Sequence, residues 1–315
     1  TIMSFKEKLQ ASFKSEDTEE WIDVHFTRPV GLVLAIGADK IDMHPNTVTI
    51  ISIVIGVASA FFFYSTDVVS NLCGVLLLMT ANFLDSADGQ LARLTGKKTI
   101  KGRMLDGFAG DAWFFSVYFA ICMRVMPQQM PLIGIEWGPW IWILGFLAGI
   151  MSHSPQSSLS DYYRQIHLFF LKGKAGAEFD TYESQHAIYT SLPRKGAFWD
   201  RAFYFNYQNY CHSQEKRTPQ FQRLMAVIKD IYGGADKLPQ HLRDEFRKGS
   251  LPLMPLTNIL TFNTRAICLY LACLANIPWA YFLVEITVFN MMYAYMWRRH
   301  ERLCAHFVER IGKHE

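Results

Sequence analysis

Several features that would indicate other classes of protein are missing from this sequence. The six cysteines form no Cys-x-x-Cys pair, which argues against a zinc or dithiol motif, and free, buried thiols are expected. No internal repeat or low-complexity tract is found. The start of the chain lacks a basic flank, a short apolar segment and a cleavage site, so no removable signal peptide is expected. The net charge is only +3, and no nucleic-acid partner is predicted.

Apolar sequence is abundant instead. Half of the residues are hydrophobic and 15% are aromatic, whereas 19% are charged, and the charges avoid several long windows. Each window has close to the ~20 residues that a helix needs to cross a bilayer. We therefore expect an all-α, polytopic membrane protein with six transmembrane helices. The windows lie at roughly 47–65, 69–92, 104–126, 136–154, 256–275 and 277–297.

The basic residues of the loops predict an orientation. Lys and Arg are concentrated in 93–103, 159–254 and 298–302. Positively charged loops remain on the cytoplasmic side, so both termini and the site are expected there, in an inner or cytoplasmic type of membrane. The loops that contain neither Lys nor Arg are 65–70, 127–135 and 275–277.

The windows divide the chain into five predicted segments. Near the N-terminus, charges interleaved with apolar residues indicate helices that lie in the membrane interface. The long polar stretch after the fourth window is too apolar for a disordered linker, so a folded helical insertion is expected. The segments are 1–44 (interfacial), 45–160 (transmembrane helices 1–4), 161–254 (cytoplasmic insertion), 255–298 (transmembrane helices 5–6) and 299–315 (cytoplasmic tail).

An acidic motif occupies the ends of the second and third windows. Asp85 and Asp88 are three residues apart, so on a helix they share a face and can bind one cation together. Asp106 begins the next helix and can face them, and Asp111 follows. Carboxylates at membrane depth are costly and usually mark ion or substrate chemistry. With no His or Cys nearby, the cluster suits hard cations, and one or two Mg²⁺ or Mn²⁺ ions are predicted.

Glycine and arginine are interleaved with these carboxylates. Gly89 and Gly102 leave room for a ligand to approach the backbone closely. Arg93, one helical turn beyond Gly89, can hydrogen-bond to phosphate oxygens. A metal, an arginine and an accessible backbone together describe a pyrophosphate site, and the chemistry indicated is phosphoryl-group transfer.

The spacing of this motif resembles the signature of the CDP-alcohol phosphotransferase family, integral membrane enzymes of phospholipid synthesis: Asp85-x2-Asp88-Gly89-x2-Ala92-Arg93-x8-Gly102-x3-Asp106. The stretch 45–49 is similar to the start of that family's first helix, and the resemblance covers about 45–155 and 255–298. It implies a divalent-metal-dependent transferase whose metal ligands include Asp85, Asp88 and Asp106, and it implies a homodimer. It also implies that the cytidine nucleotide and its diphosphate are bound by Asn46, Thr49, Gly89, Ala92, Arg93 and Gly102.

One position departs from that signature. The family continues with an aspartate four residues after Asp106, but this position is Gly110, and the carboxylate is displaced to Asp111. On a regular helix, positions 106 and 110 are separated by about 40°, whereas 106 and 111 are separated by about 140°. A π-bulge near Gly107 or Gly110 would restore the face. We therefore hypothesise that Asp111 replaces the missing acid, as a metal ligand and, with Asp106, as a catalytic residue.

The acceptor alcohol must reach the same metal from the membrane interface. The residues His153, Ser157, Asp161 and Arg164 follow one another at spacings of 4, 4 and 3, so they share one face of a helix. This face could bind a polyol or an acceptor phosphate, or it could be an ordinary solvated helix end. Arg265 lies inside the fifth window and needs a partner there, which is either a substrate phosphate or an aspartate.

The predicted function is transfer of a phosphatidyl group from a CDP-activated lipid, such as CDP-diacylglycerol, to a polar alcohol in phospholipid biosynthesis, with release of CMP. Inositol or inositol phosphate is favoured, because the basic inner face and the polar fourth helix suit a charged polyol. Glycerol 3-phosphate and serine are alternatives, as is transfer from CDP-choline or CDP-ethanolamine to diacylglycerol or a ceramide-like alcohol. A cation transporter is a different class, but Arg93 would hinder cation passage. A family member that binds nucleotide without catalysis is the remaining alternative.

Overall fold

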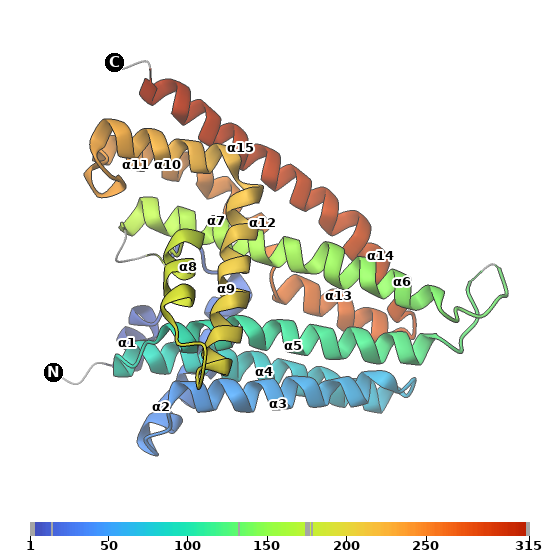
Figure 1. The fold of residues 1–315 in the computed structure, drawn as a ribbon. Helices are drawn as coiled ribbons and strands as arrows, with labels where there is room; N and C mark the ends of the chain where they lie inside the picture. The colour runs from blue at the N-terminus through green and yellow to red at the C-terminus, as the bar shows by residue number, and fades with distance from the viewer. Residues whose placement is uncertain (1–3, 14, 132, 174–176, 178, 313–315) are drawn as a thin grey trace. The chain divides into compact units, whose positions relative to one another are not determined.

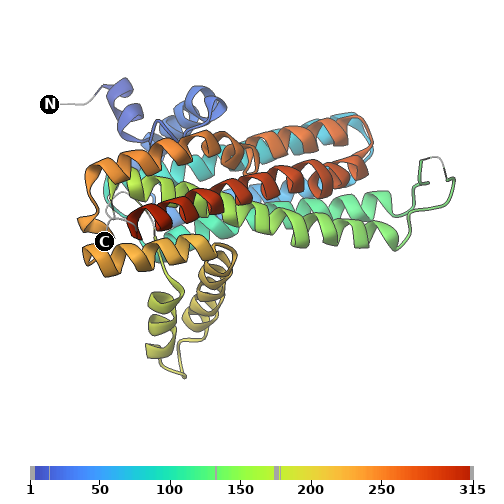
Figure 2. The same cartoon turned by 90° about the horizontal axis from the view of Figure 1, so that it is seen from above.

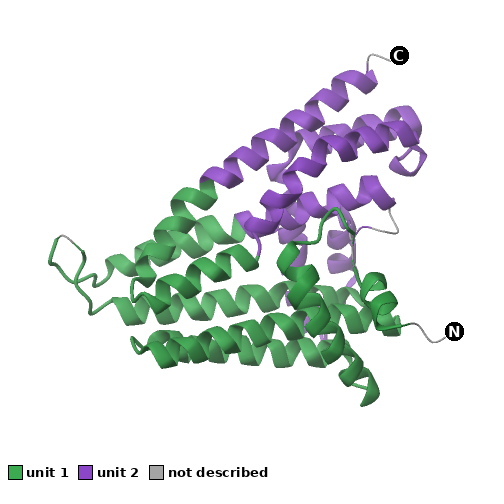
Figure 3. Cartoon of the chain, turned by 180° about the vertical axis from the view of Figure 1, so that it is seen from behind, with its two compact units in different colours: residues 1–155, 262–290 green, residues 156–261, 291–315 purple. Residues whose placement is uncertain are grey.

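The computed structural model describes residues 4–13, 15–131, 133–173, 177 and 179–312 (Figure 1). Over these residues the protein is helical and has no strand; an isolated antiparallel bridge joins Gln129 and Glu136. The predicted all-α class is therefore confirmed. The chain forms two compact units, coloured separately in Figure 3: unit 1 comprises 1–155 and 262–290, and unit 2 comprises 156–261 and 291–315.

Unit 1 is built around three long helices, α3 (Pro45–Tyr64), α4 (Val68–Thr95) and α5 (Ile100–Val125). α3 packs against both α4 and α5 (Figure 1). By length and composition, each is able to cross a membrane, and they coincide with the first three predicted windows. Local signals fix their ends: α3 begins at Pro45, and Gly96, with φ of 70°, ends α4.

The other three windows are divided into shorter elements. The fourth contains α6 (Trp140–Phe146), which continues into the π-helical segment η2 (Leu147–His153). The fifth holds α13 (Asn263–Leu274), and the sixth holds α14 (Pro278–Val284), followed by the π-helical segment η6 (Glu285–Phe289). Among the described residues, only α3, α4 and α5 are single helices long and apolar enough to span a membrane.

Buried polar side chains in unit 1 find partners on neighbouring helices. Arg124, near the end of α5, is 3% exposed. Its guanidinium donates to the Phe63 carbonyl oxygen at 3.0 Å and to the Asn71 side-chain oxygen at 2.9 Å. It also donates to the Asn276 side-chain oxygen at 2.8 Å. In an apolar interior each unmade hydrogen bond is costly, so this arginine holds together the helix ends that carry its acceptors.

The N-terminal part of unit 1 contains α1 (Phe5–Ala11), the π-helical segment η1 (Asp23–Thr27) and α2 (Arg28–Lys40). α2 packs against α4, with Leu32 and Ala35 completely buried. Its other side is apolar as well, and Val33 there is 59% exposed. An element with one apolar face against the protein and a second one uncovered is typical of a helix at a membrane surface.

Unit 2 contains the helices of the predicted insertion, all but the first two residues of α7 and all but the first residue of α15. These elements are α7 (Ser154–Lys172), α8 (Tyr182–Ser191), α9 (Phe198–Arg217), α10 (Pro219–Tyr232), η4 (Ala235–Lys237), α11 (Gln240–Ser250), η5 (Leu251–Leu253), α12 (Met254–Ile259) and α15 (Asn290–Gly312). α8 and α9 lie side by side (Figure 2), and Phe221 and Phe246, on α10 and α11, are completely buried in the interior of unit 2. The predicted segments 161–254 and 299–315, as far as they are described, therefore lie in one compact unit.

Candidate active site

Three of the four predicted carboxylates come together in unit 1. One oxygen atom from each of Asp85, Asp88 and Asp106 lies within 4.8 Å of the other two. Asp85 and Asp88 project from the same face of α4, and Asp106 meets them from the second turn of α5. Asp88 is 4% exposed, while the other two are partly buried. Three oxygen donors at this separation fit a hard divalent cation, which could contact all of them.

Thr49 holds one of these carboxylates from the neighbouring helix. Its hydroxyl, on the second turn of α3, is within hydrogen-bonding distance of the Asp88 carboxylate and of the Pro45 carbonyl oxygen. The threonine is 2% exposed. A hydrogen bond to a ligand carboxylate fixes its orientation, which is the usual function of the residues around a metal site. The structure therefore places Thr49, predicted from the sequence as a nucleotide contact, directly beside a predicted metal ligand.

Two further predicted nucleotide residues meet where α3 and α5 begin. The Thr99 hydroxyl caps α5 by accepting a hydrogen bond from the Gly102 amide at 2.9 Å. A Cβ atom at position 102 would lie 2.8 Å from the side-chain oxygen of Asn46. Glycine is therefore required for this close approach, and it brings the Asn46 amide against the first turn of α5.

Arg93 lies along α4 beside the glycine of the motif. The Nη1 atom of its guanidinium would be 3.4 Å from a Cβ atom at Gly89. Ala92, the small residue between them in the signature, is partly buried on the same helix. The arginine thus folds back over the turn that follows Asp88, and its guanidinium would supply hydrogen-bond donors to a substrate phosphate bound there.

Asp111 lies apart from this group. α5 is α-helical from Ile100 to Val125, so the predicted π-bulge near Gly107 or Gly110 is wrong. Without it, Asp106 and Asp111 point about 140° apart around the helix. The Asp111 side chain is exposed, and it does not belong to the group formed by the other three aspartates.

Two of the predicted acceptor residues, Arg265 and His153, are buried in unit 1. Arg265 is completely buried and forms an ion pair with Glu285, which is also completely buried. His153, at the end of η2, has its Nδ1 atom 2.8 Å from Nη1 of Arg265 and 3.0 Å from the Tyr118 hydroxyl. Glu285 was not singled out from the sequence. A lone acid in an apolar window was the signal that could have found it, because such a residue needs a buried partner.

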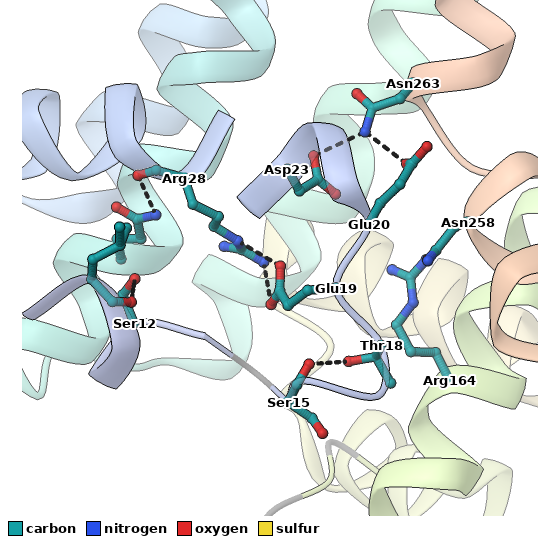
Figure 4. Close-up of polar contacts among 12 residues, drawn as sticks. Ser12, Ser15, Thr18, Glu19, Glu20, Asp23, Arg28, Arg164, Asn258 and Asn263 are labelled. Carbon is teal, nitrogen blue, oxygen red and sulfur yellow. Dashed lines mark hydrogen bonds and ion pairs between the residues drawn. The ribbon is translucent and has the colours of Figure 1, made fainter. Parts of the chain in front are cut away.

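The remaining predicted acceptor residues lie on α7. Ser157, Asp161 and Arg164 belong to unit 2, whereas His153 belongs to unit 1. Arg164 donates to the Asn258 side-chain oxygen at 3.1 Å (Figure 4) and to the Thr261 hydroxyl at 3.4 Å. Both of these partners are neutral.

Residues 42–154 match the family model described as CDP-alcohol phosphatidyltransferase. Over these residues the family predicted from the motif is confirmed. The match contains all of α3, α4 and α5 with the three grouped carboxylates. No curated protein matches the chain.

The family assigns a class of reaction. CDP-alcohol phosphatidyltransferases are phosphotransferases that move a phosphatidyl group from a CDP-alcohol to an alcohol, and the predicted enzyme class is confirmed. Together with the apolar helices, the match makes this an integral membrane protein. The family depends on divalent metal, and the oxygen-only donor set of Asp85, Asp88 and Asp106 fits that requirement.

Proposed function

We propose that the protein transfers a phosphatidyl group from CDP-diacylglycerol to a polar alcohol, with inositol or inositol phosphate as the preferred acceptor. The observation that carries this proposal is the meeting of Asp85, Asp88 and Asp106 beside Arg93 in a segment that matches the family. In the reaction the acceptor hydroxyl oxygen bonds to the lipid-bearing phosphorus. The bond from this phosphorus to the bridging oxygen breaks, CMP leaves with the electron pair, and the hydroxyl proton passes to a base.

The metal site in this proposal consists of Asp85, Asp88 and Asp106, with one or two Mg²⁺ or Mn²⁺ ions. When bound, the cation neutralises diphosphate charge. Asn46, Thr49, Gly89, Ala92, Arg93 and Gly102 are assigned to the nucleotide and its diphosphate. Their supporting observations are the glycine that admits Asn46 and the arginine that lies over Gly89.

A carboxylate must accept the proton of the acceptor hydroxyl. Both Asp106 and Asp111 were candidates from the sequence. The geometry favours Asp106, because it lies in the carboxylate group, whereas Asp111 projects from another face of α5. We therefore assign Asp106 as the base that accepts the hydroxyl proton. A substitution of Asp111 tests this assignment.

Charge balance favours Arg164 over Arg265 as the contact for an acceptor phosphate. Glu285 neutralises Arg265 within a buried pair, so this arginine has little charge to offer a substrate. Arg164 has neutral hydrogen-bond partners, and its charge remains for an acceptor phosphate. Among the predicted acceptor residues, which also include His153, Ser157 and Asp161, Arg164 is therefore the preferred contact for inositol phosphate.

The proposal includes a membrane arrangement. Six spans, with both termini and the site on the cytoplasmic side, are supported by the basic loops and by the apolar elements α6–η2, α13 and α14–η6. The segment 1–44 would lie in the interface, as supported by its exposed Trp21 and Phe26. A homodimer is proposed from the family resemblance alone.

The test is CMP release by the purified protein in lipid nanodiscs with Mg²⁺ or Mn²⁺. CDP-diacylglycerol is supplied with inositol, inositol phosphate, glycerol 3-phosphate or serine in separate reactions. The proposal expects release that depends on one of the first two acceptors and is absent in Asp88→Asn. Release with another acceptor would retain the reaction and overturn the acceptor assignment. Release only from CDP-choline or CDP-ethanolamine with a lipid alcohol would overturn the donor as well.

A further inference from the structure

The N-terminal brace, residues 19–40, packs directly behind the carboxylate turn of α4. A Cβ atom at Gly31 would lie 2.9 Å from the Ser86 hydroxyl oxygen and 3.3 Å from the Ala87 backbone nitrogen. Both residues of α4 lie between Asp85 and Asp88 in the chain. The brace thus reaches the backbone of the turn from which two of the predicted metal ligands project.

Gln90 joins the two elements with a hydrogen bond. It is completely buried, and its side-chain nitrogen donates to the Arg28 carbonyl oxygen at 3.0 Å. Positions 88 and 90 are about 160° apart around a regular helix, so Gln90 faces away from the carboxylate group and toward the brace. The residue lies within the signature at a position for which the motif specifies no residue type.

The brace is itself tied down in unit 1. The Arg28 guanidinium binds the Glu19 carboxylate through two hydrogen bonds, of 3.0 and 3.1 Å (Figure 4). The Glu19 side chain is only 4% exposed. At the start of α13, the Asn263 amide donates to Glu20 at 2.8 Å and to Asp23 at 2.9 Å. The bidentate ion pair between Arg28 and Glu19 and the hydrogen bonds from Asn263 therefore hold the brace in place. This fixes the backbone carbonyl group of Arg28 that Gln90 contacts.

We propose that the N-terminal brace positions the metal ligands of α4, with Gln90 as the positioning residue inside the motif. The ligand oxygens come from two helices and lie within 4.8 Å of one another, so a small rotation or shift of α4 would separate them. Thr49 of α3 contacts the Asp88 side chain, and the brace contacts the opposite face of the same turn of α4. Residues 19–40 lie outside the segment that matches the family. The metal ligands of α4 are therefore supported by a part of the chain that the family match does not include.

The test measures metal binding separately from turnover. Full-length protein in nanodiscs is titrated with Mn²⁺ alone, and free Mn²⁺ is followed by electron paramagnetic resonance. Gln90→Leu removes the donor at similar volume, and Glu19→Gln weakens the hold on Arg28 with a milder change. Both variants are expected to raise the Mn²⁺ dissociation constant, by about tenfold for Gln90→Leu, as for other residues that orient metal ligands.

The matched control is Gln208→Leu in unit 2. Gln208 is also buried, and its side-chain oxygen faces His186 at 2.8 Å. This variant should lower the melting temperature and leave Mn²⁺ binding unchanged. If Gln90→Leu and Glu19→Gln only lowered the melting temperature in the same way, the positioning role would be overturned. The proposed function is decided separately, because CMP release can be absent from a wild-type protein that still binds Mn²⁺.

Discussion

Arg265 on α13 and Glu285 on η6 form an ion pair in which neither side chain is exposed. The Tyr118 hydroxyl donates to the same carboxylate at 3.0 Å, and His153 lies beside the guanidinium at 2.8 Å. α5, η2, α13 and η6 therefore meet at one polar cluster within an apolar interior. The charges balance inside the protein, which explains how a fully charged arginine is accommodated there.

Removing one member of this pair should be more damaging than removing both. Arg265→Leu and Glu285→Leu each leave a buried charge and are expected to cost about 3–5 kcal/mol of stability. The double variant should unfold at a higher temperature than either single variant, as measured by thermal unfolding in detergent. Strictly additive losses would contradict the pairing. In the double variant, an acceptor KM close to that of the wild type would confirm that Arg265 does not bind the acceptor.

Replacing the two aspartates of α5, Asp106 and Asp111, should affect CMP release very differently. Asp106→Asn removes a member of the carboxylate group and the proposed base, so CMP release should fall by at least about 100-fold. Asp111→Asn changes a side chain outside the group and should retain activity within about threefold of the wild type, because neither a grouped carboxylate nor the proposed base is removed. Both are measured as CMP release at saturating metal. A large loss in Asp111→Asn would restore the hypothesis that Asp111 replaces the acid missing at position 110.

The sequence predicted the carboxylate group well because its geometry is mostly local. The spacing of Asp85 and Asp88 fixes a shared helical face, and a short connection between two apolar windows brings Asp106 to that face. The same local argument failed for Asp111, since it required a π-bulge. π-helical segments occur instead in η1, η2 and η6, where no sequence pattern indicated them.

Contacts between distant parts of the chain could not be predicted in this way. Glu285 pairs with Arg265 across the junction of α13 and α14, and Gln90 contacts Arg28 across 62 positions of the chain. Neither contact could be predicted from residue spacing, because both contacts depend on how the helices pack. The windows at 256–275 and 277–297 were found by composition, but composition did not show the break at 260–262 or the π-helical segment η6.

Thr49 provides a test of how the carboxylate group is oriented. Thr49→Val keeps the shape of the side chain and removes the hydroxyl that contacts Asp88. Loss of such a contact typically reduces metal affinity or activity by about 10–100-fold, and we expect a rise in the Mn²⁺ concentration needed for half-maximal CMP release. Thr49→Ser retains the hydroxyl and should stay near the wild type. Equal effects of the two substitutions would indicate that the methyl group, rather than the hydrogen bond, is important.

His300 on α15 should make the stability of unit 2 sensitive to acid. Its ring stacks on Tyr163 with centroids 3.8 Å apart and is 1% exposed. Burial lowers the pKa of His300 from its usual 6.5 to about 3, because the charged form would lose its water. Between pH 6.5 and about pH 3, His300 binds a proton in the unfolded chain but not in the folded protein. Stability is therefore fully present above pH 6.5 and declines as the pH falls toward 3, by up to about 1.4 kcal/mol per pH unit.

The comparison is between wild type and His300→Phe, which keeps an aromatic ring against Tyr163. Thermal unfolding is followed from pH 7 to pH 4.5 in detergent by intrinsic tryptophan fluorescence. Burial raises the pKa of the neighbouring Glu301, so this carboxyl stabilises the fold at lower pH, with the opposite sign. Because Glu301 is present in both proteins, its effect cancels in the difference between their unfolding temperatures. This difference should shift in favour of the variant as the pH falls below 6.5, and a difference independent of pH would show that folding does not change the pKa of His300.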